Sequence, residues 1–318
     1  MQSIDNKSVP NPLCNPIYRY SGQPIYAVHE VVDESLEIIR QLHSKTSHVS
    51  GYPTGFTDLD YLLSGLQPGS LTVIASRPSM GKSALALNII QNLSINNTIP
   101  TAVFSLELPK EQLVTRMLLS IAGVDTVKAR TGHLSETDLH KLDDARGLLR
   151  KSAIYIDDSS GISITELLAK VIRLKVDNNV QVIVIDYLQL MRDDSRSALN
   201  PTEISRISSS LKVLARELDI AVVLLSQLHA SVESRKSMKC RPMTSDLGNT
   251  GSLEDDADVI LLLYRETVYC KSCRMRDGSC VHNHERAAEI IIAKHKHGPV
   301  GSVYLNYYGE TMSFADLC

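Results

Sequence analysis

The residues best suited to chemistry lie in the stretch VIASRPSMGKSALALNII, which spans residues 73–90. A phosphate-binding loop has a glycine, four free residues and then Gly-Lys-Ser or Gly-Lys-Thr, so that its backbone N–H groups surround a phosphate at a helix N-terminus. Gly81, Lys82 and Ser83 match the second half, although Ser76 occupies the position of the first glycine. The alternative is an ordinary turn before a helix. Because a strand-like run precedes the loop and a helix-like run follows it, we predict that the phosphates of a nucleotide bind to Ser76, Arg77, Pro78, Ser79, Met80, Gly81, Lys82, Ser83 and Ala84.

Transfer of a phosphoryl group to water needs a cation on the phosphates, a metal held by a hydroxyl and a carboxylate, and a group that orients the water. Lys82 and Ser83 supply the cation and the hydroxyl. Asp186 ends the apolar run VIVID, Glu107 ends AVFSLE and Gln227 ends VVLLSQ. We predict that these three side chains meet in one crevice at the carboxyl ends of parallel strands. There Asp186 would bind Mg²⁺, Glu107 would polarise the water and Gln227 would sense the γ phosphate. The alternatives are a structural aspartate and, for Glu107, a charge at a helix N-terminus.

An alternating series of strands and helices has to position these groups. Apolar, β-branched runs at 71–76, 101–107, 153–158, 181–190 and 221–228 are separated by helix-like segments. This alternation predicts an α/β fold with a mainly parallel central sheet and helices on both faces. Further strand-like runs with little helix between them predict an antiparallel C-terminal extension, at 257–265, 287–298 and 301–308.

The composition is that of a globular protein: of 318 residues, 43% are hydrophobic and 22% are charged, and the net charge is −3. No apolar run approaches the roughly 18 residues that a membrane-spanning helix needs, and the opening MQSIDNKSVPNPLC lacks the regions of a signal peptide. We therefore expect a cytoplasmic protein without membrane contacts. The net charge gives no sign of nucleic-acid binding, so any such surface has to be a local basic patch.

The amino-terminal residues differ from the rest of the chain. Residues 1–27 are rich in Asn, Pro and Ser without a period, which favours a flexible arm. A helix with one apolar stripe is predicted next, because apolar residues recur at three- and four-residue spacing, at Val28, Val32, Leu36, Ile39 and Leu42. The expected parts are the arm, a linker helix and linker at 28–50, and a main domain at 51–318.

Long stretches of the sequence resemble the replicative DnaB-type hexameric DNA helicases. The matching segments occur in that family's order over residues 28–318: GYPTGFTDLDYLLSGLQPGSLTVIASRPSMGKSALALN, FSLELPKEQLVTRML, VIVIDYLQLM, ISRISSSLKVLARELDIAVVLLSQL, SDLGNTGSLEDDADVILLLYR and IIIAKHKHGPVG. The phosphate loop of that family commonly lacks the first glycine, so Ser76 is no obstacle. The resemblance implies a RecA-like helicase ATPase domain at 51–318. It also implies a hexameric ring around single-stranded DNA, with ATP and Mg²⁺ bound between neighbouring copies.

The resemblance assigns roles to matching residues: Lys82 and Ser83 hold phosphate and Mg²⁺, Glu107 is the catalytic base, Asp186 is the second Mg²⁺ anchor, and Gln227 couples the γ phosphate to DNA loops. Arg265 and Tyr307 match the positions that hold the nucleotide base between a cation and an aromatic face. The helix from Val28 matches the linker helix that docks on the next copy. The family's N-terminal helical domain is expected to be absent or vestigial, so primase recruitment by the usual route is not expected.

The sequence departs from the family at the group that reaches the neighbouring site. The family's hairpin reads Lys-x-Arg, whereas this chain has Lys294, His295 and Lys296. Lysine keeps the positive charge but lacks the planar fork of arginine, and an arginine finger contributes about 10³ to 10⁵ in rate. We expect Lys294 and Lys296 to share this catalytic role, or hydrolysis to be slow.

The segment that faces DNA departs as well. The family's Asp-Leu-Arg-Glu-Ser-Gly reads DLGNTG here, so that Gly248 and Asn249 replace the charged pair and Gly251 remains. A basic loop nearby offers compensation, so the predicted DNA-binding residues are Arg235, Lys236, Lys239, Arg241 and Gly251. The alternative is a solvated loop.

A cysteine-rich segment at 266–286 stands where the family has a plain connection. Cys270, Cys273 and Cys280, with His282 or His284, supply four soft ligands, which are enough for a tetrahedral Zn²⁺ site. The alternative is a reduced, exposed loop.

Three functions remain open. The first is an ATP-dependent replicative DNA helicase for a chromosome, plasmid or phage, which translocates on single-stranded DNA, unwinds forked DNA and works with other replication proteins. The second is a RecA-core, DNA-dependent ATPase that acts as a regulator or loader without strand separation, which Lys296, Gly248 and Asn249 favour. The third, a metabolic P-loop kinase, is disfavoured because the C-terminal third has strands and basic hairpins instead of a lid and an acceptor pocket.

Overall fold

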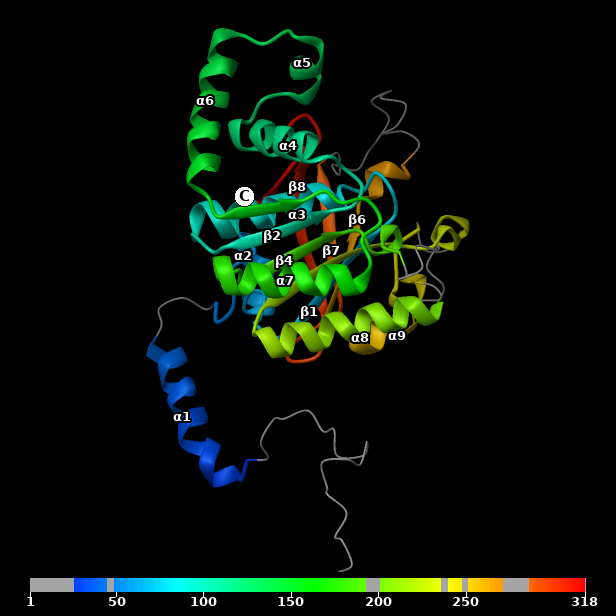
Figure 1. The fold of residues 1–318 in the computed structure, drawn as a ribbon. Helices are drawn as coiled ribbons and strands as arrows, with labels where there is room; N and C mark the ends of the chain where they lie inside the picture. Colours follow the sequence, from blue (N-terminus) through cyan, green and yellow to red (C-terminus); the bar gives the residue numbers. More distant parts are fainter. Residues whose placement is uncertain are drawn as a thin grey trace, which may run out of the picture. The chain divides into compact units, whose positions relative to one another are not determined.

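The structure, a computed structural model, describes residues 26–44, 49–192, 201–235, 240–247, 251–270 and 286–317. The chain separates into two compact units, Met1–Ser47 and His48–Cys318. The described part of the first unit contains helix α1, Val28–Ser44, where the sequence predicts a helix (Figure 1). Its apolar residues Val28, Val32, Leu36 and Ile39 are exposed.

The second unit is built on one sheet, whose described strands follow the order β3-β2-β4-β5-β1-β6-β7-β8-β9. The strands are β1 (Leu71–Ser76), β2 (Thr101–Ser105), β3 (Ile154–Asp157), β4 (Val182–Asp186), β5 (Ala221–Gln227), β6 (Val259–Tyr264), β7 (Ala287–His295), β8 (Gly301–Tyr308) and β9 (Ser313–Asp316). From β3 to β6 in this order the pairs are parallel, and from β6 to β9 they are antiparallel. The predicted α/β fold with a parallel core and an antiparallel extension is confirmed.

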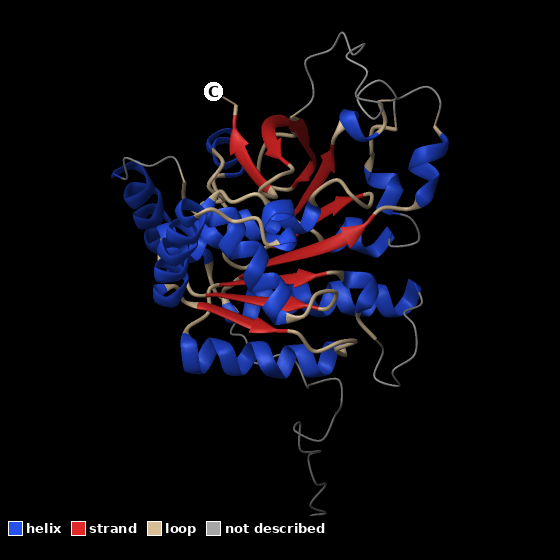
Figure 2. Ribbon diagram, turned by 90° about the horizontal axis from the view of Figure 1, so that it is seen from above, coloured by secondary structure: helices blue, strands red, loops and turns tan. Residues whose placement is uncertain are grey.

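Helices connect the parallel strands and cover both faces of the sheet (Figure 2). They are α2 (Thr57–Leu63), α3 (Lys82–Gln91), α4 (Lys110–Ala122), α5 (Thr126–Thr131), α6 (Glu136–Lys151), α7 (Ile164–Asn178), α8 (Pro201–Leu218) and α9 (Gly251–Asp256). Short turns of 3₁₀ or π-helix complete the connections: η3 (Asn92–Asn96), η4 (Leu188–Leu190), η5 (Ala230–Ser234), η6 (Thr244–Leu247) and η7 (Glu266–Val268). No helix in the described ranges is long and apolar enough to cross a membrane.

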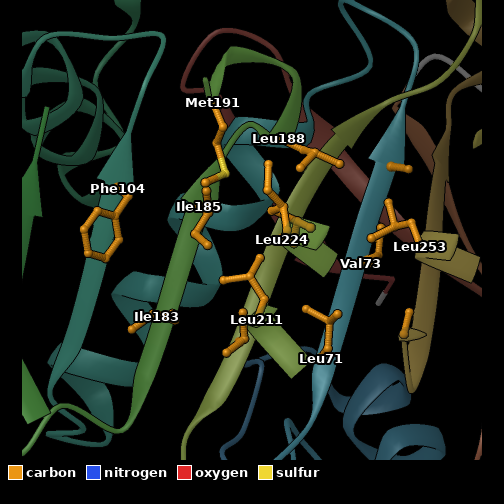
Figure 3. Close-up of a cluster of buried hydrophobic side chains, with 14 of the residues drawn as sticks. Leu71, Val73, Phe104, Ile183, Ile185, Leu188, Met191, Leu211, Leu224 and Leu253 are labelled. Carbon is orange, nitrogen blue, oxygen red and sulfur yellow. The ribbon is translucent and has the colours of Figure 1, made fainter. Parts of the chain in front are cut away.

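Two hydrophobic cores lie on the two faces because successive side chains of a strand point to opposite sides. On one face, α7, α8 and α9 pack on residues such as Leu71 and Val73 of β1 (Figure 3). On the other face, α2, α3 and α4 pack on residues such as Ile74. Strands β1, β4 and β6 are buried along their whole length. This double burial explains why their sequences are continuous apolar runs instead of alternating ones.

The extent of two strands and the presence of a third differ from the sequence prediction. The run at 101–107 is a strand only as far as Ser105, so that Glu107 lies two residues beyond the end of β2. The run at 181–190 is a strand only as far as Asp186, and a 3₁₀ turn, Leu188–Leu190, follows. Strand β9, Ser313–Asp316, was not predicted because it is short and weakly apolar. Tertiary pairing with β8 forms it, and its Phe314 N–H donates to the Asn88 side chain of α3 at 2.7 Å. The end of the chain is thereby anchored beside the helix that begins at Lys82.

Candidate nucleotide-binding site

The loop between β1 and α3 has the form that phosphate binding requires. Ser76 is the last residue of β1 and pairs with Gln227 of β5. Its backbone is therefore extended, and this position does not need a glycine. The left-handed conformations occur later in the loop, at Ser79 with φ of 66° and at Gly81 with φ of 98°. The sequence motif therefore places a glycine at a position where the backbone of this chain is extended and does not need one.

Gly81 is the position where glycine is required. It is the N-cap of α3 and lies directly before Lys82. A Cβ at this position would lie 3.1 Å from Cζ of Phe314 and 3.3 Å from Cε2 of Tyr307, in a backbone conformation that L-residues rarely adopt. The loop therefore passes closely under two aromatic rings of the C-terminal strands.

Lys82 begins α3 at the centre of the site. Burial lowers the pKa of its ammonium below the ordinary value, and the carboxylates of Asp186 and Glu107 act in the opposite direction. The ammonium Nζ lies 4.5 Å from the centre of the Tyr187 ring. Burial, Glu107 and Asp186 together raise the pKa of the Tyr187 hydroxyl. Both carboxylates therefore influence the pKa values of Lys82 and Tyr187.

Asp186 provides the test of whether the site suits a divalent cation. It ends β4, it is 5% exposed, and its Oδ1 is buried without a hydrogen-bond partner in the described structure. An unsatisfied buried carboxylate oxygen is costly, and Mg²⁺ prefers oxygen ligands. The backbone O of Asp186 accepts the Leu106 N–H at 2.8 Å, which ties the strand end to the residue before Glu107. Ser83, Glu107 and Asp186 are a chemically suitable set for this cation.

Gln227 is fixed at the end of β5. Its strand pairs with β1 on one side, and the Leu228 N–H donates to the Ser76 O at 3.0 Å. On the other side of β5, the Gln227 N–H donates to Oε1 of Gln189 at 3.2 Å. Arg77 lies beside the end of β5. Its Nη1 donates to the Leu228 O at 2.8 Å, and its Nε donates to Oε1 of Glu233 at 2.9 Å.

Most of these groups line one cavity of about 380 Å³, although the buried Asp186 is not part of its lining. It is lined by Ser76, Arg77, Pro78, Ser79, Gly81, Lys82, Ser83, Glu107, Arg116, Tyr187, Gln227, Tyr307 and Met312. Met80 and Ala84, also predicted to bind the nucleotide, are not in this lining. The Met80 side chain is buried in the core, and Ala84 packs against that core. Arg116, Tyr187 and Met312 were missed by the sequence reasoning. Arg116 looks like any polar residue of helix α4, and only the packing of α4 brings it to the site.

Arg265 and Tyr307 meet on the outer side of the loop. The guanidinium carbon of Arg265 lies 3.9 Å from the centre of the Tyr307 ring, and its Nη1 donates to the Ser79 O at 3.4 Å. Burial lowers the pKa of Arg265, with Tyr307 acting in the opposite direction. The two predicted base-binding residues are therefore in direct contact, with no base-sized gap between them.

Lys294 and Lys296 lie near the opposite end of the parallel strands from the phosphate loop. His295 pairs with Val259, and Val259 pairs with Thr72 near the amino end of β1. Since Ser76 is at the carboxyl end, the separation along β1 is roughly 13 Å. The Lys294 ammonium donates to the backbone oxygens of Glu254 and, at 3.2 Å, Asp255. The Lys296 ammonium lies 3.3 Å from Asp258 Oδ1. These lysines do not reach the cavity of their own chain.

The predicted DNA-binding arginines are engaged with buried carboxylates. Arg235 pairs with Asp246, which is 2% exposed, and Arg241 Nη2 donates to Glu289 Oε1 at 2.6 Å. Gly251 begins α9. Lys236 and Lys239 lie outside the described residues. A DNA contact by Arg235 or Arg241 stays a prediction, and it would have to compete with these ion pairs.

The zinc prediction receives no support. Within the described ranges, no group of three or more His, Cys, Asp or Glu residues could hold a metal ion. Of the predicted ligands only Cys270 is described, and it is partly buried. Cys273, Cys280, His282 and His284 lie outside those ranges.

Known proteins share the sequence pattern and the fold of this chain. The replicative DNA helicase DnaC of Bacillus subtilis (strain 168) is 43% identical over 291 residues, which are 91% of this chain and 62% of that protein. The chain thus spans less than two thirds of the curated relatives it matches. Among solved structures, one ATPase domain is 35% identical with a TM-score of 0.83, covering 93% of this chain and all of that one. A DnaB-like replicative helicase, described with its interactions with primase, is 36% identical with a TM-score of 0.80, covering 93% of this chain and 68% of that one. The RadB recombinase, 21% identical with a TM-score of 0.50 over 84% of this chain, shares the fold, which is RecA-like. The family described as DnaB-like helicase C terminal domain matches residues 51–316, and the chain belongs to that family.

Proposed function

We propose that the protein is an ATP-dependent replicative DNA helicase that translocates on single-stranded DNA and unwinds duplex DNA. The observation that carries the proposal is the convergence of three strand ends on one phosphate loop. The charges of Asp186 and Glu107 both raise the pKa of Lys82 against the effect of burial, and Gln227 lines the same cavity as Lys82. A metabolic kinase would need an acceptor pocket, whereas this cavity is bounded by a charged phosphate loop and the carboxylate of Glu107.

The residues divide the work of ATP hydrolysis in this proposal. The phosphates lie along the backbone N–H groups of residues 77–83, with the Lys82 ammonium on the β and γ phosphates. Ser83 and Asp186 hold Mg²⁺, which neutralises charge on the transferred phosphoryl group when bound. Glu107 accepts a proton from the attacking water. Gln227 contacts the γ phosphate and couples the loss of that phosphate to the DNA loops.

A second copy of the chain completes the site. Lys294 and Lys296 lie in the hairpin formed by β7 and β8, at the opposite end of the parallel strands from the cavity. A cation from this hairpin can therefore enter only the cavity of a neighbouring copy. This separation supports a closed ring of identical copies, for which we propose six. The exposed stripe of α1, with Val28 at its start, docks on the next copy. In this arrangement 28–50 is a linker helix and linker, and 51–318 is the ATPase domain. The predicted arm at 1–27 and the predicted insertion at 266–286 lie largely outside the described residues.

The nucleic-acid partner is single-stranded and forked DNA. Contacts to its phosphates come from the region 235–251, through Arg235, Lys236, Lys239, Arg241 and the backbone at Gly251. Other replication proteins are further partners.

Mixed-variant complementation tests the proposal. Lys82→Ala removes the loop cation, and the double variant Lys294→Ala/Lys296→Ala removes the hairpin cations. If hydrolysis needs both groups from different copies, each preparation alone is inactive, and a mixture regains DNA-stimulated ATP turnover because some interfaces combine both intact surfaces. A mixture that stays inactive while the native mass shows mixed rings would contradict catalysis across the interface.

Strand separation has its own test. Native mass and ATP turnover are measured with and without single-stranded DNA, and unwinding is measured on a forked duplex. A six-chain mass with strong stimulation and unwinding is expected. DNA-stimulated turnover without unwinding would instead indicate a regulator or loader, which the replacement of the finger arginine by Lys296 favours.

A further inference from the structure

Gln189 contacts the residue that the proposed mechanism uses to sense the γ phosphate. It lies in the turn η4, three residues after Asp186. Its Nε2 donates to the Gln227 O at 3.1 Å and to the Ser226 Oγ at 3.0 Å, and its Oε1 accepts the Gln227 N–H at 3.2 Å. One side-chain amide therefore satisfies both backbone groups of Gln227.

The position of this contact in the sheet explains why it matters. The ladder between β4 and β5 has its last partners at Ile185 and Leu224. Beyond that point the chain after Asp186 turns away into η4, so β5 lacks a strand neighbour on this side. Gln227 nevertheless projects its N–H and C=O toward β4, because Leu228 already bonds to Ser76 on the other side. The carboxamide of Gln189 takes the place of the missing strand, since it carries a donor and an acceptor as a peptide group does.

We propose that Gln189 is a positioning residue that holds Gln227 in register between the metal-binding strand and the phosphate loop. The proposal rests on the proposed function, because Gln227 has to act on the γ phosphate. Gln189 itself does not line the cavity. It acts through the backbone of Gln227, so that the side-chain amide of Gln227 has a fixed position along the strand relative to Ser76 and Asp186.

This arrangement predicts how a loss of Gln189 would appear. Substrate binding depends on the loop around Lys82 and should be preserved. Turnover that depends on Gln227 should fall, because a displacement of about 1 Å at a reacting group can cost 100-fold in rate. For an exposed clamp that relaxes partly, we expect roughly a tenfold loss of DNA-stimulated kcat, with a KM for ATP within about twofold.

The test compares Gln189→Ala, Gln189→Glu, Gln227→Ala and the double variant Gln189→Ala/Gln227→Ala in the full chain. Gln189→Glu keeps the acceptor for the Gln227 N–H but places an oxygen against the Gln227 O, so it should fail as Gln189→Ala does. The matched control is Gln112→Ala, at an exposed glutamine of α4. If Gln189 acts through Gln227, the double variant is no worse than Gln227→Ala. Losses that multiply, or an unaltered kcat in Gln189→Ala, would overturn the proposal.

A second measurement separates this inference from the proposed function. Amide hydrogen exchange of the segment 224–228 should accelerate in Gln189→Ala and stay as in the parent protein in Gln112→Ala, whether or not the protein hydrolyses ATP. Unchanged exchange would refute the clamp. A parent protein without ATP turnover, but with faster exchange in Gln189→Ala, would refute the helicase proposal and the catalytic consequence while retaining the structural clamp.

Discussion

Arg265 stacks directly on Tyr307, with 3.9 Å between the guanidinium carbon and the ring centre. At this distance a nucleotide base can stack only on an outer face of the pair, or after the two groups separate. We therefore expect Tyr307→Ala to raise the KM for ATP by roughly 3- to 30-fold with little change in kcat, because a ring–cation platform contributes about 0.5 to 2 kcal/mol to binding. Steady-state kinetics decide this, with Tyr307→Phe as the variant that keeps the ring. An effect of Tyr307→Ala on kcat alone would exclude a base-binding role.

Gly81 should tolerate no side chain. With φ of 98° and Phe314 Cζ 3.1 Å from an added Cβ, Gly81→Ala is expected to lower the free energy of unfolding by about 1 to 3 kcal/mol. The control is Gly147→Ala in α6, where an added Cβ meets no atom within 4 Å. That change should stabilise the protein by about 0.5 to 1 kcal/mol, because alanine favours a helix. Urea unfolding of both variants checks the pair. Equal effects of the two substitutions would contradict the strain argument.

Lys82 and Glu107 should be separable by kinetics. Lys82→Ala removes the cation from the phosphates, so we expect kcat/KM to fall by roughly 100-fold or more while the protein stays folded. Glu107→Gln removes the proton acceptor but keeps the shape, so kcat should fall by about 10² to 10⁴ with ATP binding retained. Turnover, equilibrium binding of ATP and circular dichroism are the measurements. Retained turnover in Lys82→Ala would remove the loop from the mechanism.

Asp258 links the hairpin to the core. It is 4% exposed, and its Oδ2 accepts from the Lys212 ammonium at 2.6 Å and from the Leu71 N–H at 2.8 Å. Burial raises the pKa of Asp258, but these hydrogen bonds and the charges of Lys212 and Lys296 outweigh it, so that the pKa lies below the ordinary value of 3.8. The ionised pair therefore stabilises the fold above that pH, and the contribution is lost as the pH falls through the folded pKa.

Lys212→Ala leaves the buried Asp258 with the partly exposed Lys296 as its cationic partner in the described structure and with the hydrogen bond from the Leu71 N–H. We expect a loss of roughly 2 to 3 kcal/mol in the free energy of unfolding at neutral pH, which shrinks on acidification because the carboxyl then protonates. Urea unfolding at neutral and acidic pH measures it, with the exposed Lys141→Ala as control. A loss that is independent of pH would mean that the charge of Lys212 is not what stabilises the strand.

Much of this molecule is readable from its sequence, for physical reasons that particular elements illustrate. The runs at 71–76 and 221–227 are buried on both faces, so their composition alone identifies them as central parallel strands. Such strands present their carboxyl ends on one side of the sheet, which is why the sequence predicts one crevice for Lys82, Glu107, Asp186 and Gln227. In the structure Lys82, Glu107 and Gln227 line one cavity. The apolar spacing of α8 likewise predicts a packed helix, and its Ile207 and Leu211 are buried.

What the sequence alone determined is therefore the order of elements and the chemistry at the strand ends, because both depend on local patterns. Only the tertiary structure showed why position 76 needs no glycine, that Phe314 covers Gly81, and that Arg116 reaches the cavity. It also decided that Arg235 and Arg241 pair with buried carboxylates, and that Gln189 completes the end of β5. These contacts join residues far apart in the chain or depend on how one helix packs, and no local period of the sequence encodes such a pairing.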